Sequence, residues 1–369
     1  MRQVGNATEG VKFQNGREKR TEGEFLREMR LNRRQLLRRL GLGTATFGMS
    51  SNGKADEASL PTTSEADVEQ GELGPVTRWA VRAALEFRVH PSYGRRLPWE
   101  IPGIVYKRGG NIDLKLDVFT PGIETQKRPT FIYIHGGGWV HAWKEDFIFI
   151  LLPYLTRGMN TVNVEYRKAD QSPAPAAVED CRDALRWVHK HAEEYGFSTS
   201  KIVVAGGSSG GHLALMTGML DPSDGFDDTT AYALGHGPLP VAAIVNFFGQ
   251  YDLTELLDGP GRSDWALEWF SGVPNRMELA KKLSPLSYVR KGLPPIISIH
   301  GTKDIPTYQQ AVRFHEALDR AGVRNQLVTI KGGGHGWSTW SMQDNLRSQA
   351  MIFKFLEANG ILTEGSQSD

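Results

Sequence analysis

The sequence has a single cysteine, Cys181, among 369 residues. One cysteine excludes an intramolecular disulfide and a cysteine-rich metal site. Cys181 falls on the apolar face of a helix predicted between residues 173 and 195, so we expect a buried core residue there. Beyond residue 75 the chain also lacks internal repeats and low-complexity tracts.

The net charge of the whole chain is also small, at +1. Residues 1–50 hold eleven Lys and Arg against five Glu, a net charge of +6, so residues 51–369 carry −5. A mildly acidic body lacks the basic surface on which nucleic-acid binding depends. We therefore expect no nucleic-acid partner.

The N-terminal region has no apolar run of membrane-spanning length. Arg33 and Arg34 precede Leu36 and Leu37, and a weakly apolar, glycine-rich segment of about ten residues follows, too short to cross a bilayer. This pattern resembles a twin-arginine export signal, and a basic amphipathic helix start is the alternative. Small residues at 50–58 supply candidate cleavage sites.

These features divide the chain into three parts. We predict an N-terminal extension with a twin-arginine-type signal peptide at residues 1–58, with Met29 as a candidate native start. A polar linker is expected at 59–75 and a folded domain at 76–363. The signal predicts export to the periplasm or beyond, without a stable membrane anchor, and a cytoplasmic location is the alternative.

Within the domain, the hydrophobic pattern alternates between strands and helices. Alternating β and α units predict an α/β fold with a mostly parallel sheet and helices on both faces. Helices are expected at 173–195, 309–321 and 344–359. Short apolar strands are predicted at residues 104–106, 112–119, 131–134, 161–164, 202–205, 241–245, 295–299 and 326–330.

A Gly/Ser-rich turn links the strand 202–205 to a helix that starts near His212. The turn fits the pattern G-x-S-x-G in two registers, with either Ser208 or Ser209 at its apex. A serine at such an apex is held in a strained backbone conformation and projects its hydroxyl toward the helix N-terminus. The turn therefore predicts a nucleophile, and an ordinary Gly/Ser turn is the alternative.

Three further motifs follow the ends of predicted strands. Ligands of parallel sheets bind beyond the carboxyl ends of the strands, so we expect these motifs to meet the Gly/Ser turn. A histidine such as His335 can take the proton of a serine, and an ionised carboxylate can fix the histidine tautomer. The motifs are His135–Trp139, His300–Asp304 and Gly332–Trp337.

Together these motifs resemble the α/β-hydrolase esterases and lipases with an HGGGW loop, relatives of the hormone-sensitive-lipase-like group and of bacterial acetyl and feruloyl esterases. The resemblance covers residues from about 103 to 358. It implies the α/β-hydrolase fold, with a mostly parallel eight-stranded sheet, helices on both faces and a short cap. Further segments that resemble the family are Val164–Arg167, residues 173–187 and Ser284–Tyr288.

The resemblance also implies a catalytic triad. In esterases the run S-x-G-G-H-L-A has its nucleophile at the first serine, which is Ser208 here. The motif H-G-x-x-D supplies the carboxylate, Asp304, and His335 is the base. Residues 305–306, Ile-Pro, depart from the D-x-x-V-P pattern of the family, and the nearby Asp319 is a poor substitute for Asp304 because it lies within a predicted helix.

In the same family the loop glycines form an oxyanion hole. The resemblance implies that Gly137, Gly138 and Ser209 donate backbone N–H groups to the oxyanion. His135 is expected to brace the loop without taking part in the chemistry. His212 and His300 belong to motifs but are expected to be structural.

A segment at about 251–292 occupies the position of the cap in this family. Several tryptophans lie in the cap or directly after the predicted site motifs, where they could stack on a sugar or an aromatic acyl group. Core packing is the alternative for each of them. The predicted substrate contacts are Trp139, Trp265, Trp269 and Trp337.

These observations predict a serine carboxylesterase that hydrolyses short-chain acyl or carbohydrate esters, such as acetyl esters, through an acyl-enzyme. We expect no metal or organic cofactor, and a small-molecule or carbohydrate ester as the substrate. The alternatives are an aryl formamidase or small peptidase on the same fold, and a non-catalytic binding protein. The complete set of Ser, Asp, His and glycine residues favours an enzyme.

Overall fold

The computed structural model describes residues 99–109, 111–121, 126–227, 239–259, 261–304 and 308–363. The predicted signal segment, the linker and residues 76–98 of the predicted domain lie outside the described residues. None of the helices in the described stretches combines the length and hydrophobicity needed to cross a membrane.

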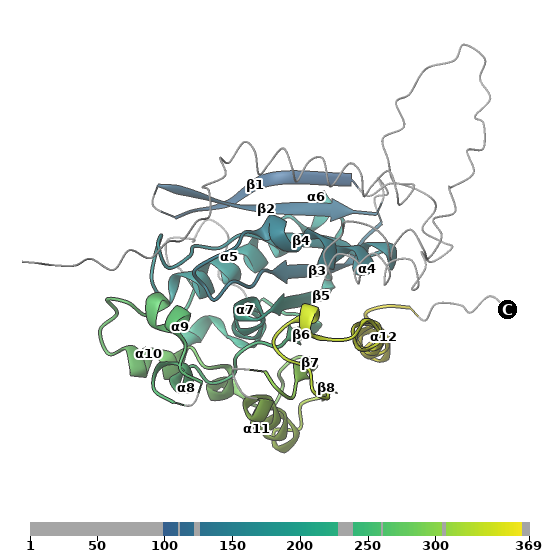
Figure 1. The fold of residues 1–369 in the computed structure, drawn as a ribbon. Coiled ribbons are helices and arrows are strands. Elements are labelled where there is room, and N and C mark those ends of the chain that lie inside the picture. Colours follow the sequence, from purple (N-terminus) through teal and green to yellow (C-terminus); the bar gives the residue numbers. More distant parts are fainter. Residues whose placement is uncertain are drawn as a thin grey trace, which may run out of the picture. The chain divides into compact units, whose positions relative to one another are not determined.

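An eight-stranded sheet forms the centre of the described part, in the order β1-β2-β4-β3-β5-β6-β7-β8 (Figure 1). β1 and β2 pair antiparallel, as do β2 and β4, and every other neighbouring pair is parallel. The predicted mostly parallel sheet is therefore confirmed. The strands are β1 (Trp99–Gly109), β2 (Ile112–Thr120), β3 (Arg128–Ile134), β4 (Asn160–Val164), β5 (Phe197–Gly207), β6 (Ala243–Phe247), β7 (Ile296–Gly301) and β8 (Asn325–Ile330).

The sixth strand lies two residues later than the predicted 241–245. The apolar run suggested an end at Val245, but the strand continues through the polar Asn246, which is fully buried. Asn246 Oδ1 accepts a hydrogen bond from the N–H of Gly249 at 2.9 Å, so the buried amide oxygen has a partner inside the fold.

Central strands are buried on both faces, as a parallel sheet between two helical layers requires. Every residue of β4 and β6 is buried. β2 starts with alternating exposed and buried residues, where it pairs only with β1, and becomes continuously buried from Leu116 to Phe119, where it also pairs with β4. The alternation therefore marks the part of the hairpin that faces solvent on one side.

Two apolar cores lie on opposite faces of the sheet. One contains Ile132, Val204 and Ile244, the other their strand neighbours Phe131, Val203 and Val245. α5, α7 and α11 contribute to the first core and α4 and α12 to the second. The helices are α4 (Leu152–Thr156), α5 (Ala176–Lys190), α6 (Ala192–Tyr195), α7 (Ser209–Met219), α11 (Tyr308–Arg320) and α12 (Met342–Ala358).

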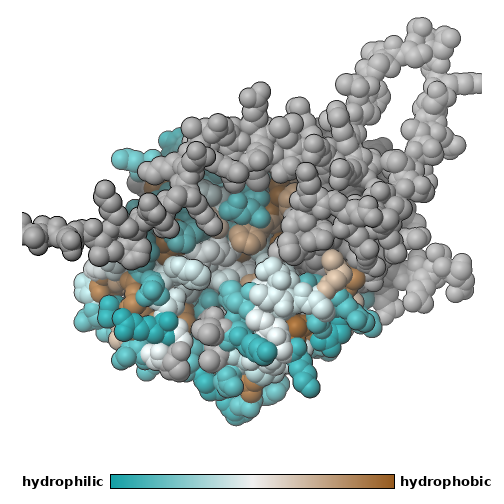
Figure 2. All heavy atoms as spheres, in the orientation of Figure 1, coloured by the Kyte–Doolittle hydropathy of each residue, from teal (hydrophilic) through white to brown (hydrophobic). Residues whose placement is uncertain are grey.

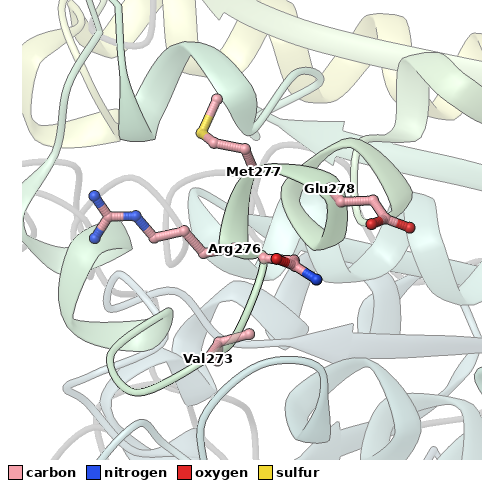
Figure 3. Close-up of a pocket in the computed structure, with 5 residues that line it drawn as sticks. Val273, Arg276, Met277 and Glu278 are labelled. Atoms are coloured by element: carbon pink, nitrogen blue, oxygen red, sulfur yellow. The ribbon is translucent and has the colours of Figure 1, made fainter.

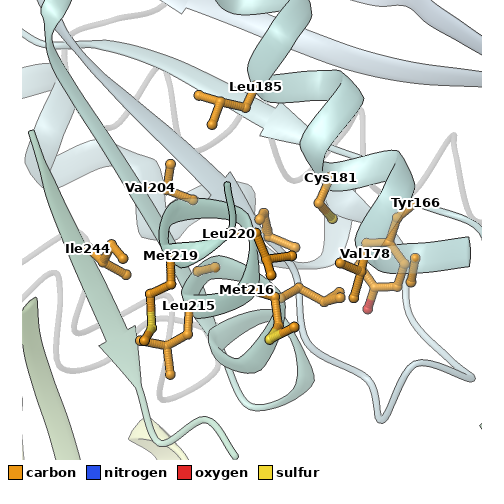
Figure 4. Close-up of a cluster of buried hydrophobic side chains, with 14 of the residues drawn as sticks. Tyr166, Val178, Cys181, Leu185, Val204, Leu215, Met216, Met219, Leu220 and Ile244 are labelled. Carbon is orange, nitrogen blue, oxygen red and sulfur yellow. The ribbon is translucent and has the colours of Figure 1, made fainter. Parts of the chain in front are cut away.

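Figure 4 shows the first core between α5 and α7. Cys181 lies there among apolar side chains, 1% exposed, and burial raises the pKa of its thiol well above the ordinary value. Cys181 is thus a buried core residue on the apolar face of α5, as predicted. Short 3-10 helices complete the chain: η2 (Lys144–Leu151), η3 (Pro222–Asp224), η5 (Pro285–Tyr288) and η6 (Trp337–Thr339).

The segment between β6 and β7 holds the predicted cap, residues 251–292. It contains α8 (Thr254–Leu257), α9 (Asp264–Trp269), α10 (Arg276–Lys282) and η5. Ala266, Trp269 and Phe270 anchor it in the first core. A shallow pocket on its surface, lined by Val273, Asn275, Arg276, Met277 and Glu278, contains none of the predicted site residues (Figure 3).

Hydrophilic side chains cover most of the described surface in Figure 2, and the hydrophobic patches are small and separate. Few large apolar side chains are exposed in the described part. Two of them, Trp143 and Trp265, are tryptophans. The exposed set is Ile101, Val105, Trp143, Trp265 and Met277.

Candidate active site

Ser208 stands at the junction of β5 and α7 in a strained backbone conformation, with φ 57° and ψ −128°. The turn is possible because its neighbours are glycines. A Cβ on Gly206 would meet the carbonyl of Gly210, and a Cβ on Gly210 would meet the carbonyl of Ile134. Only glycine lets α7 start this close to β3 and β5. The result is the geometry of a nucleophile elbow.

The structure brings Ser208, His335 and Asp304 together from three different loops. His335 Nε2 lies 2.8 Å from Ser208 Oγ, and His335 Nδ1 lies 2.6 Å from Asp304 Oδ1. A carboxylate only accepts hydrogen bonds, so Nδ1 donates to Asp304 and Nε2 is left to accept from the serine hydroxyl. This is the arrangement that nucleophilic catalysis by serine requires.

The alternative serine does not share this geometry. Ser209 is the first residue of α7 and is fully buried, whereas Ser208 is partly exposed. Its N–H lies in the first turn of the helix, where backbone donors have no intrahelical acceptor. The position suits a backbone donor to a group bound at Ser208 Oγ.

Asp304 is held by a second histidine that the sequence interpretation called structural. His300 Nε2 lies 3.0 Å from Asp304 Oδ2, and both side chains are fully buried. Burial raises the pKa of Asp304, but the nearby imidazoles of His300 and His335 outweigh it and keep the pKa below its ordinary value. Asp319 is bound elsewhere, to Asn325 at 2.7 Å. Residues 305–307, after Asp304, lie outside the described part.

Residues 135–139, the predicted oxyanion loop, run beside the elbow. A Cβ on Gly136 would lie 2.7 Å from the carbonyl oxygen of Gly207 and 3.2 Å from Ser208 Cβ. Gly137 and Gly138 have positive φ angles, 121° and 65°. Within the described part of the chain, their N–H groups donate to no carbonyl. They are therefore free to bind an oxyanion.

His135 braces this loop from below. It is fully buried, its Nδ1 donates to the Gly136 carbonyl at 2.7 Å, and its ring stacks on Tyr166 at 4.4 Å. Glu165 lies under it, with Oε1 3.5 Å from His135 Nε2 and 2.5 Å from Lys168 Nζ. Burial raises the pKa of Glu165, but His135 and Lys168 lower it to about 2.

Sequence reasoning missed Glu165, although it stands in the segment Val164–Arg167 that resembles the family. The signal was a carboxylate directly after a fully buried strand, where a charge needs partners. Those partners come from distant positions: Lys144 donates its backbone N–H to Glu165 Oε2 at 2.9 Å and its ammonium to Asp117 at 2.7 Å.

Three of the four tryptophans predicted to contact the substrate are buried in the structure. Trp139 and Trp269 are 2% and 0% exposed and stack on each other, with ring centroids 4.8 Å apart. Trp337 is 5% exposed and packs edge-on against Phe248 at 4.7 Å. Because each indole is enclosed by other aromatic rings, none presents a face to a ligand.

Trp265 is different, because the residue is 52% exposed. A Cβ on Gly138 would lie 2.9 Å from three atoms of the Trp265 side chain, so the indole rests against the oxyanion loop. Trp265 therefore combines contact with the site and an open surface. Among the described residues no three His, Cys, Asp or Glu side chains converge as a metal site would require.

The fold and the site define an α/β-hydrolase with a Ser-His-Asp arrangement. The family model BD-FAE matches residues 116–318, which is more than half of the chain's 369 residues. The chain belongs to this family of α/β-hydrolase esterases.

Two curated relatives are named as esterases. Esterase LipQ of Mycobacterium tuberculosis is 30% identical over 244 residues, covering 63% of this chain and 56% of its own. Carboxylesterase NlhH of the same organism is 27% identical over 241 residues, covering 63% of this chain and 74% of its own. The chain thus spans about half the length of LipQ and of the related esterase LipC, for which the share is 54%.

Solved structures with the same fold include esterase 2 of Thermogutta terrifontis. Its apo form superimposes with a TM-score of 0.60 at 30% identity, covering 71% of this chain and 95% of that one. The same protein phosphonylated by sarin gives a TM-score of 0.62 at 30% identity and the same coverage of both chains. The match supports the assignment of the fold across the described domain.

Proposed function

We propose that this protein is a serine carboxylesterase. The observation that carries the proposal is the hydrogen-bonded chain from Ser208 Oγ through His335 to Asp304, with distances of 2.8 and 2.6 Å. The serine is at a strained elbow beside glycine N–H groups that have no carbonyl partner among the described residues, and the carboxylate is buried and held ionised. Family membership and the printed names of the relatives point the same way.

In this reaction Ser208 Oγ attacks the ester carbonyl carbon while His335 Nε2 takes the hydroxyl proton. The N–H groups of Gly137, Gly138 and Ser209 stabilise the oxyanion, and removal of one such donor typically costs about 10²–10³ in rate. His335 then protonates the leaving alcohol, which leaves an acyl group on Ser208. Water attacks that acyl-enzyme with the same base, and the acid is released.

The test compares the two serines of the turn. Ser208→Ala should lower the hydrolysis of p-nitrophenyl acetate by several orders of magnitude with an unchanged Tm. Ser209→Ala should retain most of the activity, because only its backbone N–H is used. Intact-mass measurement after treatment with a fluorophosphonate should show one adduct on the wild type and none on Ser208→Ala. An active Ser208→Ala variant would end the proposal.

For the substrate we propose short-chain acyl esters or acetylated carbohydrates. The acyl side is supported by structures of Thermogutta terrifontis esterase 2 with propionate and with butyrate. The alcohol side rests on Trp265, whose indole lies against the oxyanion loop with half of its surface open. An exposed indole face can stack on a sugar ring.

This specificity is tested with paired substrates and paired tryptophans. Trp265→Ala should raise KM for an acetylated xylo-oligosaccharide several-fold more than KM for p-nitrophenyl acetate, because uniform binding of the alcohol is lost. Trp143→Ala is the control, since Trp143 is 49% exposed but has the Lys168 ammonium over its ring. Equal effects of Trp265→Ala on both esters, or a preference for acyl chains of about eight carbons or more, would contradict this substrate class. Faster turnover of N-formylkynurenine would favour a formamidase.

We further propose that the protein is exported through its twin-arginine segment. Support comes from the sequence alone: Arg33 and Arg34, followed by Leu36, Leu37 and a short glycine-rich apolar stretch. In a bacterial host, protein beginning at Met29 should reach the periplasm, and the double variant Arg33→Lys, Arg34→Lys should remain in the cytoplasm. Fractionation followed by esterase assay measures this. Unchanged export of the double variant would remove the proposal.

A further inference from the structure

A buried aromatic unit lies behind the oxyanion loop, formed by Trp139, His212 and Trp269. The two indoles stack in parallel planes, 4.8 Å apart with 6° between them. The imidazole stands edge-on to both, at 5.4 Å from Trp139 and 5.9 Å from Trp269. The unit joins three segments of the chain: the loop after β3, the helix α7 that follows the elbow, and α9 of the cap.

Hydrogen bonds fix the protonation state of His212. Its Nε2 lies 2.7 Å from the carbonyl oxygen of Leu283, which only accepts, so Nε2 carries a proton. Trp139 Nε1 only donates, and it points at His212 Nδ1 at 3.2 Å, so Nδ1 offers its lone pair. The ring is therefore neutral, in agreement with a pKa that burial lowers to about 4.

The residue that His212 holds is itself strained. Trp139 has φ +63°, a left-handed conformation that is unfavourable for a bulky residue. It directly follows Gly137 and Gly138, the two glycines whose N–H groups we propose as oxyanion donors. Its carbonyl accepts from the N–H of Ala169 at 3.0 Å. A strained backbone of this kind persists only where several surrounding contacts hold it in place.

We propose that His212 is a positioning residue for the oxyanion loop. Ser208 caps α7, and His212 lies one turn further along the same helix. The imidazole holds the Trp139 indole by its N–H and thereby sets the position of the preceding glycine N–H groups relative to the serine hydroxyl. The rigid helix α7 thus holds both the nucleophile, Ser208, and the residue that positions the oxyanion hole relative to it, His212. This inference rests on the proposed esterase function.

Trp139→Phe is the first test, because phenylalanine keeps an aromatic ring to stack on Trp269 but has no N–H for His212. We expect kcat for p-nitrophenyl acetate to fall about 10- to 100-fold, a fraction of the loss of a whole oxyanion donor. KM should change less than twofold. The Ki of a trifluoromethyl ketone, whose adduct places an oxyanion in the hole, should rise by the same factor as kcat/KM falls.

A matched control is Trp187→Phe. Trp187 is also a buried indole, 4% exposed, and stacks on a histidine, His191, at 4.3 Å, but it belongs to α5. The same loss of aromatic volume there should lower Tm without changing kcat or the Ki of the ketone. Trp139→Phe therefore separates positioning from general packing.

Two substitutions of His212 test its two hydrogen bonds separately. The oxygen of His212→Asn can replace the Nδ1 acceptor for Trp139, whereas the amide nitrogen of His212→Gln can replace the Nε2 donor to Leu283. We expect the asparagine variant to keep kcat within about threefold and the glutamine variant to lose as much as Trp139→Phe. Equal losses in both, or the reverse order, would show that His212 only anchors the cap.

The outcomes are separable from those of the proposed function. If Ser208→Ala is inactive while Trp139→Phe keeps a normal kcat and ketone Ki, this inference is overturned and the esterase function stands. If Ser208→Ala retains activity, the esterase function fails and the positioning role fails with it. A parallel loss in kcat and transition-state affinity in Trp139→Phe, absent in Trp187→Phe, supports the inference.

Discussion

Asp304 stands between two histidines, with His335 on one carboxylate oxygen and His300 on the other. The carboxylate has a lowered pKa and is ionised at neutral pH. It fixes the Nδ1–H tautomer of His335, and it can stabilise the imidazolium that forms when the serine proton is taken. An amide at this position would keep the volume but would present N–H groups to His335 and favour the wrong tautomer.

Asp304→Asn should therefore cripple turnover while leaving the fold intact. We expect kcat to fall by up to ~10⁴, the loss seen in a comparable triad, with KM within a few-fold of the wild type. Steady-state kinetics on p-nitrophenyl acetate measure both. Asp319→Asn is the control, because Asp319 bonds Asn325 and should be dispensable for turnover. Near-normal activity in Asp304→Asn would mean that another carboxylate serves His335.

At the scale of elements, the position of α7 depends on glycines at its first turn. A Cβ on Gly210 would meet the backbone carbonyls of Ile134 and His135. Backbone of a central strand cannot move aside as a flexible side chain can, because its hydrogen bonds to the neighbouring strands hold it in place. The closeness of α7 to β3 is also what places the oxyanion loop beside the elbow.

Gly210→Ala should consequently destabilise the protein by about 1–3 kcal/mol, the usual cost of overpacking a core. Gly261→Ala should change the free energy of unfolding by less than about 0.5 kcal/mol, because the nearest atom to its added Cβ lies 3.5 Å away, an ordinary contact. Urea unfolding of both variants provides the comparison. Equal stability of the two variants would show that α7 can shift without cost.

At the scale of the whole molecule, two buried histidines link stability to pH. Burial lowers the pKa of His212 and of His315 to about 4. Unfolding exposes both rings, and their pKa returns to about 6.5. Between those values the unfolded chain binds more protons than the folded one, so stability is complete above pH 6.5 and declines as the pH falls toward 4.

The free energy of unfolding should accordingly be lower at pH 4.5 than at pH 7, by roughly 2–3 kcal/mol for each histidine. His315→Gln removes one of these contributions and should reduce the loss by roughly 2–3 kcal/mol. Urea unfolding of wild type and variant at both pH values measures the difference. Identical losses in wild type and His315→Gln would contradict the assignment.

The sequence by itself determined the architecture and the meeting of the site motifs. Alternating apolar strands and amphipathic helices allow only a mostly parallel sheet, and a parallel sheet brings the ends of its strands to one edge. Ser208, Asp304 and His335 each follow a different strand, so the topology alone makes them neighbours. The glycines around Ser208 predict the strained turn, because no other residue fits at their positions. The catalytic roles of these residues stay predictions until the variants are measured.

Only the tertiary structure decided which side chains face a ligand and which face each other. Trp139, Trp265 and Trp269 have the same chemistry, and the first and last are buried because residues 130 positions apart in sequence stack on each other. Spacing along a chain carries no information about such a pair. The same holds for Glu165 under His135, and for His212, whose partners Trp139 and Leu283 come together only when the loops and the cap close over the sheet.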